Sequence, residues 1–300
     1  MSINTIKTGF LMMFLSSLLV IAAYFIGGPN NWQISIIIAL VFSIGMNFFA
    51  YWYSDRIALK MSGAREISEG EYKELHWIVE EQARLSGMPK PRVYIIENDS
   101  PNAFATGRNP HNAAVAATTG IIRLLNKQEL ASVMAHEMAH VGNRDTLIMT
   151  MAASIAGAIM AIAFIARFAM FFGGMNRGRQ SGGSGLIPII GLVVVAIVLP
   201  IAAVLVRLAI SRAREYQADA SGARLTKNPL ILADALEKLE SVSKRKPMKV
   251  NEAVSHLFIV NPLSGKSMSR LFSSHPPMAE RVKRLRKMSS LQITNGTLYR

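Results

Sequence analysis

Two long apolar runs near the start of the chain constrain its fold more than any other feature. The first covers residues 8–27 and the second residues 34–53, and neither contains Asp, Glu, Lys or Arg. Each run is long enough to cross the hydrocarbon core of a bilayer as a helix. A signal peptide would have a shorter apolar core and a cleavage site after it, which this sequence lacks. The sequence therefore predicts an N-terminal transmembrane hairpin over residues 1–54.

The charges around this hairpin predict its orientation. Lys7 precedes the first run, and Arg56, Lys60 and Arg65 follow the second, whereas the connecting loop contains no Lys or Arg. Because positive residues remain on the inner side of a membrane, both ends of the hairpin are expected in the cytoplasm.

Two further apolar runs lie in the second half of the chain. They cover residues 147–172, interrupted by Arg167, and residues 186–208, and a Gly/Ser-rich loop joins them. Their length favours a second transmembrane hairpin over residues 147–208. The alternative is a buried helical hairpin inside the soluble part.

The composition agrees with a membrane protein. Hydrophobic residues make up 51% of the chain and charged residues only 17%, which is too apolar for an ordinary soluble enzyme. The formal net charge of +14 could indicate binding to nucleic acid or to an anionic membrane surface. Since no nucleic-acid-binding motif is present, we expect the lipid bilayer as a partner and no nucleic acid.

The polar parts of the sequence, residues 55–146 and 209–300, predict an α+β domain that the second hairpin divides into two parts. Ser68 with Glu71, and Asn126 with Glu129, have the spacing of capping boxes at helix starts. The elements expected before the second hairpin are a helix over 68–86, a strand over 92–97, a loop over 98–110, a strand over 113–119 and a helix over 126–145.

The pattern H-E-x-x-H at residues 136–140 is the strongest chemical signal. On a helix, His136 and His140 lie one turn apart on the same face, so both imidazoles can bind one metal ion. Glu137 lies beside the metal, where it can accept a proton from a water molecule that the metal activates. The chain has no cysteine, so the ligands must be nitrogen and oxygen atoms. The pattern predicts one zinc ion.

A catalytic zinc usually takes a third protein ligand, and the best candidates are Glu215 and Asp219. They are spaced i, i+4 on a predicted helix. One of them can bind zinc while the other holds a ligand histidine by its second ring nitrogen. The alternative is a surface Glu215 in an ion pair with Arg212 or Arg214.

These motifs, taken in order, resemble the HtpX family of membrane zinc endopeptidases, which is related to the CAAX prenyl endopeptidases. The resemblance covers nearly the whole chain and rests on H-E-M-A-H with N-R-D at residues 143–145, the hydrophobic hairpin, S-R-A-R-E-Y-Q-A-D at 211–219, P-N-A-F-A-T-G at 101–107 and S-H-P-P at 274–277. It implies a mainly α membrane protein with two hydrophobic helical hairpins and a zincin-like protease domain that contains a small β-sheet.

The resemblance also implies roles for individual residues. His136, His140 and Glu215 would bind the zinc ion, Glu137 would be the general base, and Asp219 would hold a ligand histidine.

Further residues are implied around the cleft. Asn102 would bind substrate, and His275 and Arg281 would stabilise the oxyanion. Asp145 is expected to have a structural role at the end of the helix. A substrate chain is expected to pair with an exposed edge strand over residues 113–119. The residues of that strand expected to bind substrate are Ala113, Val115 and Ala117.

The two hairpins would hold the cleft at the cytoplasmic face of a prokaryotic plasma (inner) membrane, in a multi-pass protein. The expected substrates are membrane proteins, including misfolded ones, and the resemblance implies a role in quality control and stress response, together with self-cleavage. The alternatives are a narrow-specificity processing endopeptidase and a non-catalytic membrane scaffold. A metal transporter would place its ligands inside the apolar runs, whereas here the ligands flank them.

Overall fold

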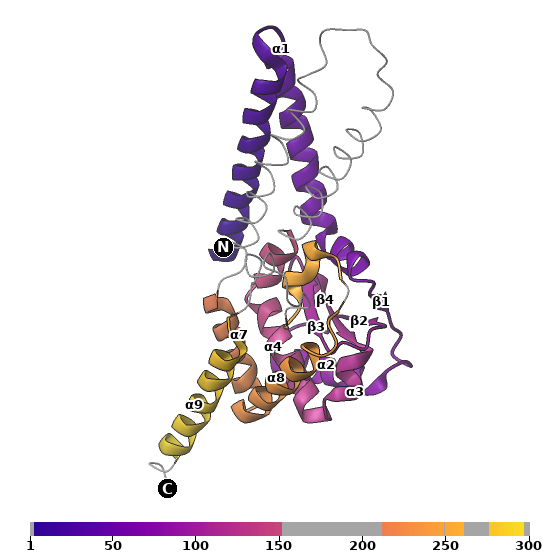
Figure 1. Ribbon diagram of the computed structural model, residues 1–300, viewed down its shortest axis with the longest axis vertical. Helices are drawn as coiled ribbons and strands as arrows, with labels where there is room; N and C mark the ends of the chain where they lie inside the picture. The colour runs from indigo at the N-terminus through magenta and orange to yellow at the C-terminus, as the bar shows by residue number, and fades with distance from the viewer. Residues whose placement is uncertain (1–2, 152–211, 249, 261–275, 297–300) are drawn as a thin grey trace.

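The computed structural model describes residues 3–151, 212–248, 250–260 and 276–296 (Figure 1). Nearly all of the run predicted over residues 147–172, the whole run over 186–208, and His275 lie outside the described residues.

The first helix, α1 (Ile3–Met61), folds back on itself, so that its two arms lie side by side (Figure 1). The Nδ2 of Asn47 donates a hydrogen bond to Ser16 Oγ at 2.9 Å. In a straight helix these two residues would lie about 46 Å apart, at 1.5 Å per residue. Among the described residues, one helical segment is long and apolar enough to span a membrane, Trp32–Met61, and large apolar side chains along it are exposed.

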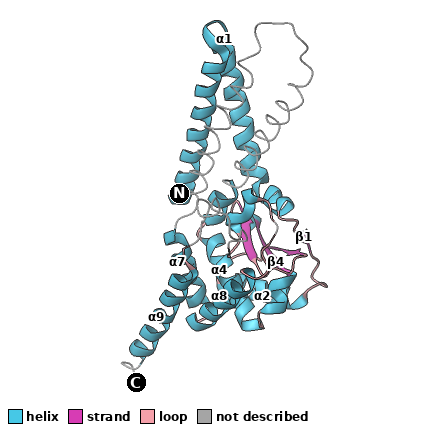
Figure 2. Cartoon of the chain, viewed as in Figure 1, coloured by secondary structure: helices cyan, strands magenta, loops and turns pink. Residues whose placement is uncertain are grey.

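A four-stranded sheet lies beside the end of α1 (Figure 2). Its strands are β1 (Arg65–Glu66), β2 (Arg92–Ile96), β3 (Ala103–Gly107) and β4 (Ala113–Thr118), in the order β1-β2-β4-β3. The β2–β4 pair is parallel and the other two pairs are antiparallel.

Two expectations about this sheet were wrong. Residues 98–110 were expected to form a loop, but they contain strand β3. The strand expected at the edge, β4, lies inside the sheet, because β2 and β3 bond to it on either side. A substrate chain therefore cannot pair with β4, and Ala113, Val115 and Ala117 are not available to bind it.

Each face of the sheet packs against different elements. On one face, Val93, Val115 and Ala105 join the core formed by α2 (Lys73–Leu85), α4 (Lys127–Gly142) and α8 (Pro229–Ser243). The opposite face packs against the end of α1, which contributes Ala58 and Leu59. The remaining described elements are η1 (Pro110–Asn112), α3 (Thr119–Leu124), α7 (Arg212–Leu225), η2 (Glu252–Leu257) and α9 (Met278–Gly296).

Helix α2 begins later than its predicted capping box. Glu71 Oε1 accepts a hydrogen bond from the Ser68 backbone N–H at 3.2 Å, but this pair closes a turn before the helix. Tyr72 then takes a left-handed conformation with φ of 44°, and the helix starts at Lys73. The predicted helix start at Ser68 was therefore wrong, because the left-handed residue Tyr72 separates the turn from the helix.

Candidate metal centre

Helix α4 begins at the predicted capping box. Asn126 Oδ1 accepts from the backbone N–H of Glu129 at 2.9 Å, and Glu129 Oε2 accepts from the backbone N–H of Asn126 at 3.0 Å. These contacts satisfy backbone donors that a helix start otherwise leaves unpaired. The helix ends at Gly142, three residues before the predicted end at Asp145.

His136 and His140 lie on the buried side of α4, one turn apart. Their exposed fractions are 1% and 4%, and their rings meet edge to face with centroids 4.8 Å apart. The helical spacing expected from H-E-x-x-H is therefore present, and it brings the two imidazoles into one site.

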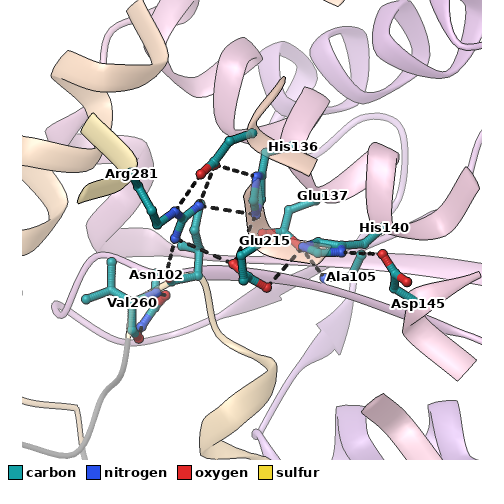
Figure 3. A network of polar contacts seen from close by, with 11 residues as sticks. Asn102, Ala105, His136, Glu137, His140, Asp145, Glu215, Val260 and Arg281 are labelled. Carbon is teal, nitrogen blue, oxygen red and sulfur yellow. Dashed lines mark hydrogen bonds and ion pairs between the residues drawn. The ribbon is translucent and has the colours of Figure 1, made fainter. Parts of the chain in front are cut away.

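Helix α7 brings Glu215 to these histidines (Figure 3). Glu215 Oε1 lies 3.4 Å from His140 Nε2, and Oε2 lies 3.9 Å from His136 Nε2. The ligand atoms of the three residues all lie within 4.8 Å of one another, and all three residues are buried. Glu215 is therefore not at the surface, which was the alternative left open by its spacing.

A carboxylate faces the second nitrogen of each imidazole. His136 Nδ1 lies 3.0 Å from Asp219 Oδ1, and His140 Nδ1 lies 3.1 Å from Asp145 Oδ2. These contacts orient both rings so that their Nε2 atoms face Glu215. The structure brings Asp219 to a histidine as the resemblance implied, and it gives Asp145 the same position at the other histidine.

The place of Asp145 was missed by sequence reasoning, which expected only a structural residue there. Arg144 has a φ of 59°, so the chain turns sharply between Gly142 and Asp145. That left-handed turn directs the Asp145 carboxylate back toward His140. The only signal in the sequence was an acidic residue shortly after the second histidine.

Arg281, from α9, lies at one side of the polar network, on the left in Figure 3, and is fully buried. Its Nε and Nη2 donate to the two carboxylate oxygens of Asp219 at 2.8 and 2.7 Å. Its Nη1 lies 3.6 Å from Glu215 Oε2, and its Nη2 lies 3.5 Å from His136 Nε2. Burial alone would raise the pKa of Asp219, but the charge and hydrogen bonds of Arg281 hold that pKa at about 2.

The donor set suits a divalent cation such as zinc. Two imidazoles and one carboxylate are ligands that zinc accepts, and they converge in a buried site. Burial works to lower the pKa of His140, but hydrogen bonds with Asp145 and Glu215 outweigh it and raise the pKa to about 10. The carboxylates of Asp145 and Glu215 thus stabilise a positive charge beside His140. A bound cation would supply such a charge.

Glu137 lies next to the ligands and is held by the sheet. Its Oε2 accepts a hydrogen bond from the backbone N–H of Ala105 at 2.8 Å. Burial is the main cause that raises the pKa of Glu137 to about 8. A carboxyl group with that pKa can both accept and release a proton near neutral pH.

Asn102 is also buried, and its amide contacts the chain's own backbone. Its Nδ2 donates to Val260 O at 2.8 Å, and its Oδ1 accepts from Val260 N–H at 3.2 Å. The other predicted cleft residue, His275, lies outside the described residues. Among the cleft residues that the resemblance implied, the structure therefore brings Arg281 to the metal cluster, whereas the Asn102 amide contacts Val260.

Comparison with known proteins agrees with this arrangement. Residues 69–289 match the family model described as Peptidase family M48. A protein named Protease HtpX homolog from Desulfatibacillum aliphaticivorans is 49% identical over 282 residues, covering 94% of this chain and 89% of that protein. One of the same name from Thermococcus kodakarensis is 49% identical over 285 residues, covering 95% and 96%.

A solved structure shares the fold. The crystal structure of S. mikatae Ste24p matches with a TM-score of 0.50 at 19% sequence identity. The match covers 94% of this chain and 65% of that chain, so this protein spans about two thirds of the length of Ste24p. Because the family model and the HtpX homologues both match most of the sequence, the chain belongs to peptidase family M48 and is a metalloendopeptidase.

Proposed function

We propose that this peptidase hydrolyses peptide bonds with one zinc ion held by His136, His140 and Glu215. The observation that carries the proposal is the convergence of these three buried side chains, whose ligand atoms lie within 4.8 Å of one another. When bound there, zinc would polarise the substrate carbonyl and lower the pKa of a water molecule.

In this proposal, Glu137 transfers the protons. Its carboxylate, held at 2.8 Å by the Ala105 N–H, takes a proton from the attacking water and later delivers it to the leaving amide nitrogen. Burial raises the pKa of Glu137 toward neutral pH, which favours delivery of the proton to the leaving nitrogen. The surrounding burial excludes bulk water, which would otherwise compete for the proton.

Asp145, Asp219 and Arg281 position the other groups. Each aspartate fixes one imidazole, and Arg281 fixes Asp219 while keeping a positive charge beside Glu215. That charge would stabilise the negative charge that develops on the substrate oxygen during attack. We include His275 as a second candidate for the same task, because the family resemblance implies it.

The substrates that we propose are membrane proteins, including misfolded ones, cut in segments at the cytoplasmic face. The candidate span Trp32–Met61 ends against one face of the sheet, where Ala58 and Leu59 pack with Phe104. Near the same level, the Arg108 guanidinium lies 4.2 Å from the centre of the Trp52 ring. Trp at a membrane boundary, with Arg beside it, is typical of the headgroup region.

This arrangement supports a cleft that lies close to a bilayer surface. We propose a multi-pass protein of a prokaryotic inner membrane with a cytoplasmic catalytic domain that takes part in quality control and cleaves itself. The positive residues Lys7, Arg56 and Lys60, near the two ends of α1, support this orientation.

The test is purification of the full chain in detergent, followed by metal analysis and cleavage of unfolded casein. Wild type should carry about one zinc per chain and cleave casein. Glu137→Gln should keep the zinc and lose cleavage. The control Glu97→Gln, at an exposed glutamate, should retain both.

Zinc that stays absent after repletion would overturn the proposal. Zinc without cleavage of any unfolded protein would instead favour a narrow-specificity peptidase or a scaffold.

A further inference from the structure

The segment Phe258–Val260 lies along the outer edge of β3, next to the metal cluster (Figure 3). The Ile259 N–H donates to the Ala103 carbonyl at 3.0 Å. The Asn102 side chain bonds to both the N–H and the carbonyl of Val260. The segment is therefore attached to the edge of the sheet by its backbone.

Arg281 connects the same segment to the metal cluster. Its Nη1 donates to the Ile259 carbonyl at 3.3 Å while the same guanidinium bonds to Asp219. The N–H and carbonyl groups of Ile259 and Val260 are thus all engaged. Their partners are a strand carbonyl, a primary amide and a guanidinium, which recognise backbone atoms and do not depend on the side chains of the segment.

Strand β3 is one of the two edges of the sheet and the one that contacts Glu137, so an extended peptide added here would lie beside the metal cluster. The Asn102 carbonyl accepts from Thr118 N–H, so Asn102, Phe104 and Thr106 direct their backbone groups toward β4. By alternation, Ala103, Ala105 and Gly107 direct theirs outward. Peptides that bind by strand addition use such outward groups.

The outward groups are already engaged within the protein. Ile259 bonds to the Ala103 carbonyl, Glu137 accepts from Ala105 N–H, and Thr146 Oγ1 donates to the Gly107 carbonyl at 2.9 Å. A substrate chain could not pair with this edge at Ala103 while Ile259 holds it.

We propose that Phe258–Val260 is a built-in peptide mimic that occupies the backbone-binding site of the cleft and is displaced when substrate binds. This inference rests on the proposed function. It assigns Ala103, Asn102 and Arg281 as the groups that bind the backbone of an extended peptide. In the structure the segment occupies this site, and we call this the closed state.

The side chains of the segment indicate which peptides displace it best. Ile259 and Val260 are buried in the core that also contains α4, with exposed fractions of 1% and 7%. Phe258 packs edge to face on Phe104, with ring centroids 5.0 Å apart. A substrate with consecutive apolar side chains would refill these positions and offset the cost of displacement.

The decisive measurement is hydrogen–deuterium exchange in the Glu137→Gln variant, full length in detergent, with and without unfolded casein. The variant should bind casein without cutting it, and binding is followed separately with fluorescently labelled casein. Saturation should raise the exchange rate of the Ile259 and Val260 amides at least about tenfold, while β4 amides stay protected. Bound casein with unchanged protection at these two amides would overturn the inference and leave the proposed function standing.

A second variant tests the same idea without exchange data. In the Glu137→Gln background, Ile259→Pro removes the N–H that bonds to Ala103, whereas the matched control Ile259→Val keeps it. Both variants remove side-chain atoms that Ile259 buries in the core, so loss of the hydrogen bond should tighten casein binding roughly fivefold for the proline variant relative to the valine variant. Weaker binding by a folded proline variant would overturn the inference, because the segment would then be part of the substrate-binding wall.

The remaining outcomes are also decisive. If the proline variant does not fold, the hydrogen–deuterium exchange measurement decides whether the segment is displaced. If the proline variant binds casein and the other two proteins do not, the result supports the inference. If casein binds to none of these proteins, the proposed function fails, and the inference falls with it.

Discussion

The carboxylate of Glu137 accepts a hydrogen bond from the backbone N–H of Ala105, with 2.8 Å between nitrogen and oxygen. Glu137 lies on α4 and Ala105 lies in the middle of the edge strand β3. The sheet therefore fixes the direction of the proposed general base, while the helix fixes the metal ligands. A base held from both sides is sensitive to the length of its side chain.

The first prediction concerns that length. Glu137→Asp keeps a carboxylate but shortens the side chain by one methylene, which removes it from the Ala105 N–H. A displacement of about 1 Å in a reacting group can cost about a hundredfold in rate, so we expect a kcat about 10²-fold below wild type. Zinc content should not change, because Glu137 is not a proposed ligand. A kcat equal to that of wild type, measured on casein, would contradict this role.

The parts of the site that could be predicted from sequence are those set by short-range rules. The capping box at Asn126 and Glu129, and the i, i+4 spacing of His136 and His140, depend only on helix geometry. Glu215 is 75 residues beyond His140 in the sequence, and its spacing left a surface ion pair as an alternative. Only the packing of α7 against α4 brings it to the histidines.

Strand pairing was harder to predict because it is not local. The segment Ala103–Gly107 carries small residues and one aromatic, a weak strand pattern, and it was expected to be a loop. Without β3, the strand Ala113–Thr118 was expected at the edge, whereas it lies inside the sheet. The role of Asp145 depends on the left-handed turn at Arg144. Arginine does not favour that conformation, so the residue at this position does not indicate a turn.

A second prediction follows from the two aspartates that orient the imidazoles. Asp145→Asn and Asp219→Asn should each weaken zinc affinity about 10- to 100-fold, because each variant removes the charge that orients a ligand histidine. Competition with a zinc-binding dye would measure this. Asp234→Asn, at an exposed aspartate on α8, is the control and should leave affinity unchanged. An Asp145 variant with wild-type affinity would return that residue to a structural role.

The third prediction concerns Arg281 and stability. Arg281→Met should leave the buried Asp219 carboxylate without its charged partner and with His136 as its remaining neighbour, and removal of one partner from such a buried pair costs about 3–5 kcal/mol. Chemical unfolding of the protein in detergent would measure the change in unfolding free energy. Lys283→Met, two residues later on the exposed face of α9, should change it by no more than about 0.5 kcal/mol. Equal losses for the two variants would refute the structural importance of the buried pair.

The close approach of α7 to α4 depends on Gly222. A Cβ atom at this position would lie 2.8 Å from the backbone nitrogen of His136 and 3.0 Å from its Cα. These are backbone atoms of the helix that carries the metal ligands, so they cannot move aside independently. At Gly142, by contrast, the nearest atom to an added Cβ is the Met88 sulfur at 3.3 Å, on a flexible side chain.

The last prediction compares alanine at these two glycines. Gly222→Ala should separate α7 from α4, moving Glu215 away from His136, and should lower zinc affinity together with stability, the latter by about 1–3 kcal/mol as in other overpacked cores. Gly142→Ala should be neutral or stabilise the protein by up to about 1 kcal/mol, since alanine favours a helix more than glycine does. Zinc titration and thermal unfolding of both variants test this. If Gly222→Ala bound zinc as wild type does, the metal centre would not depend on the distance between the two helices.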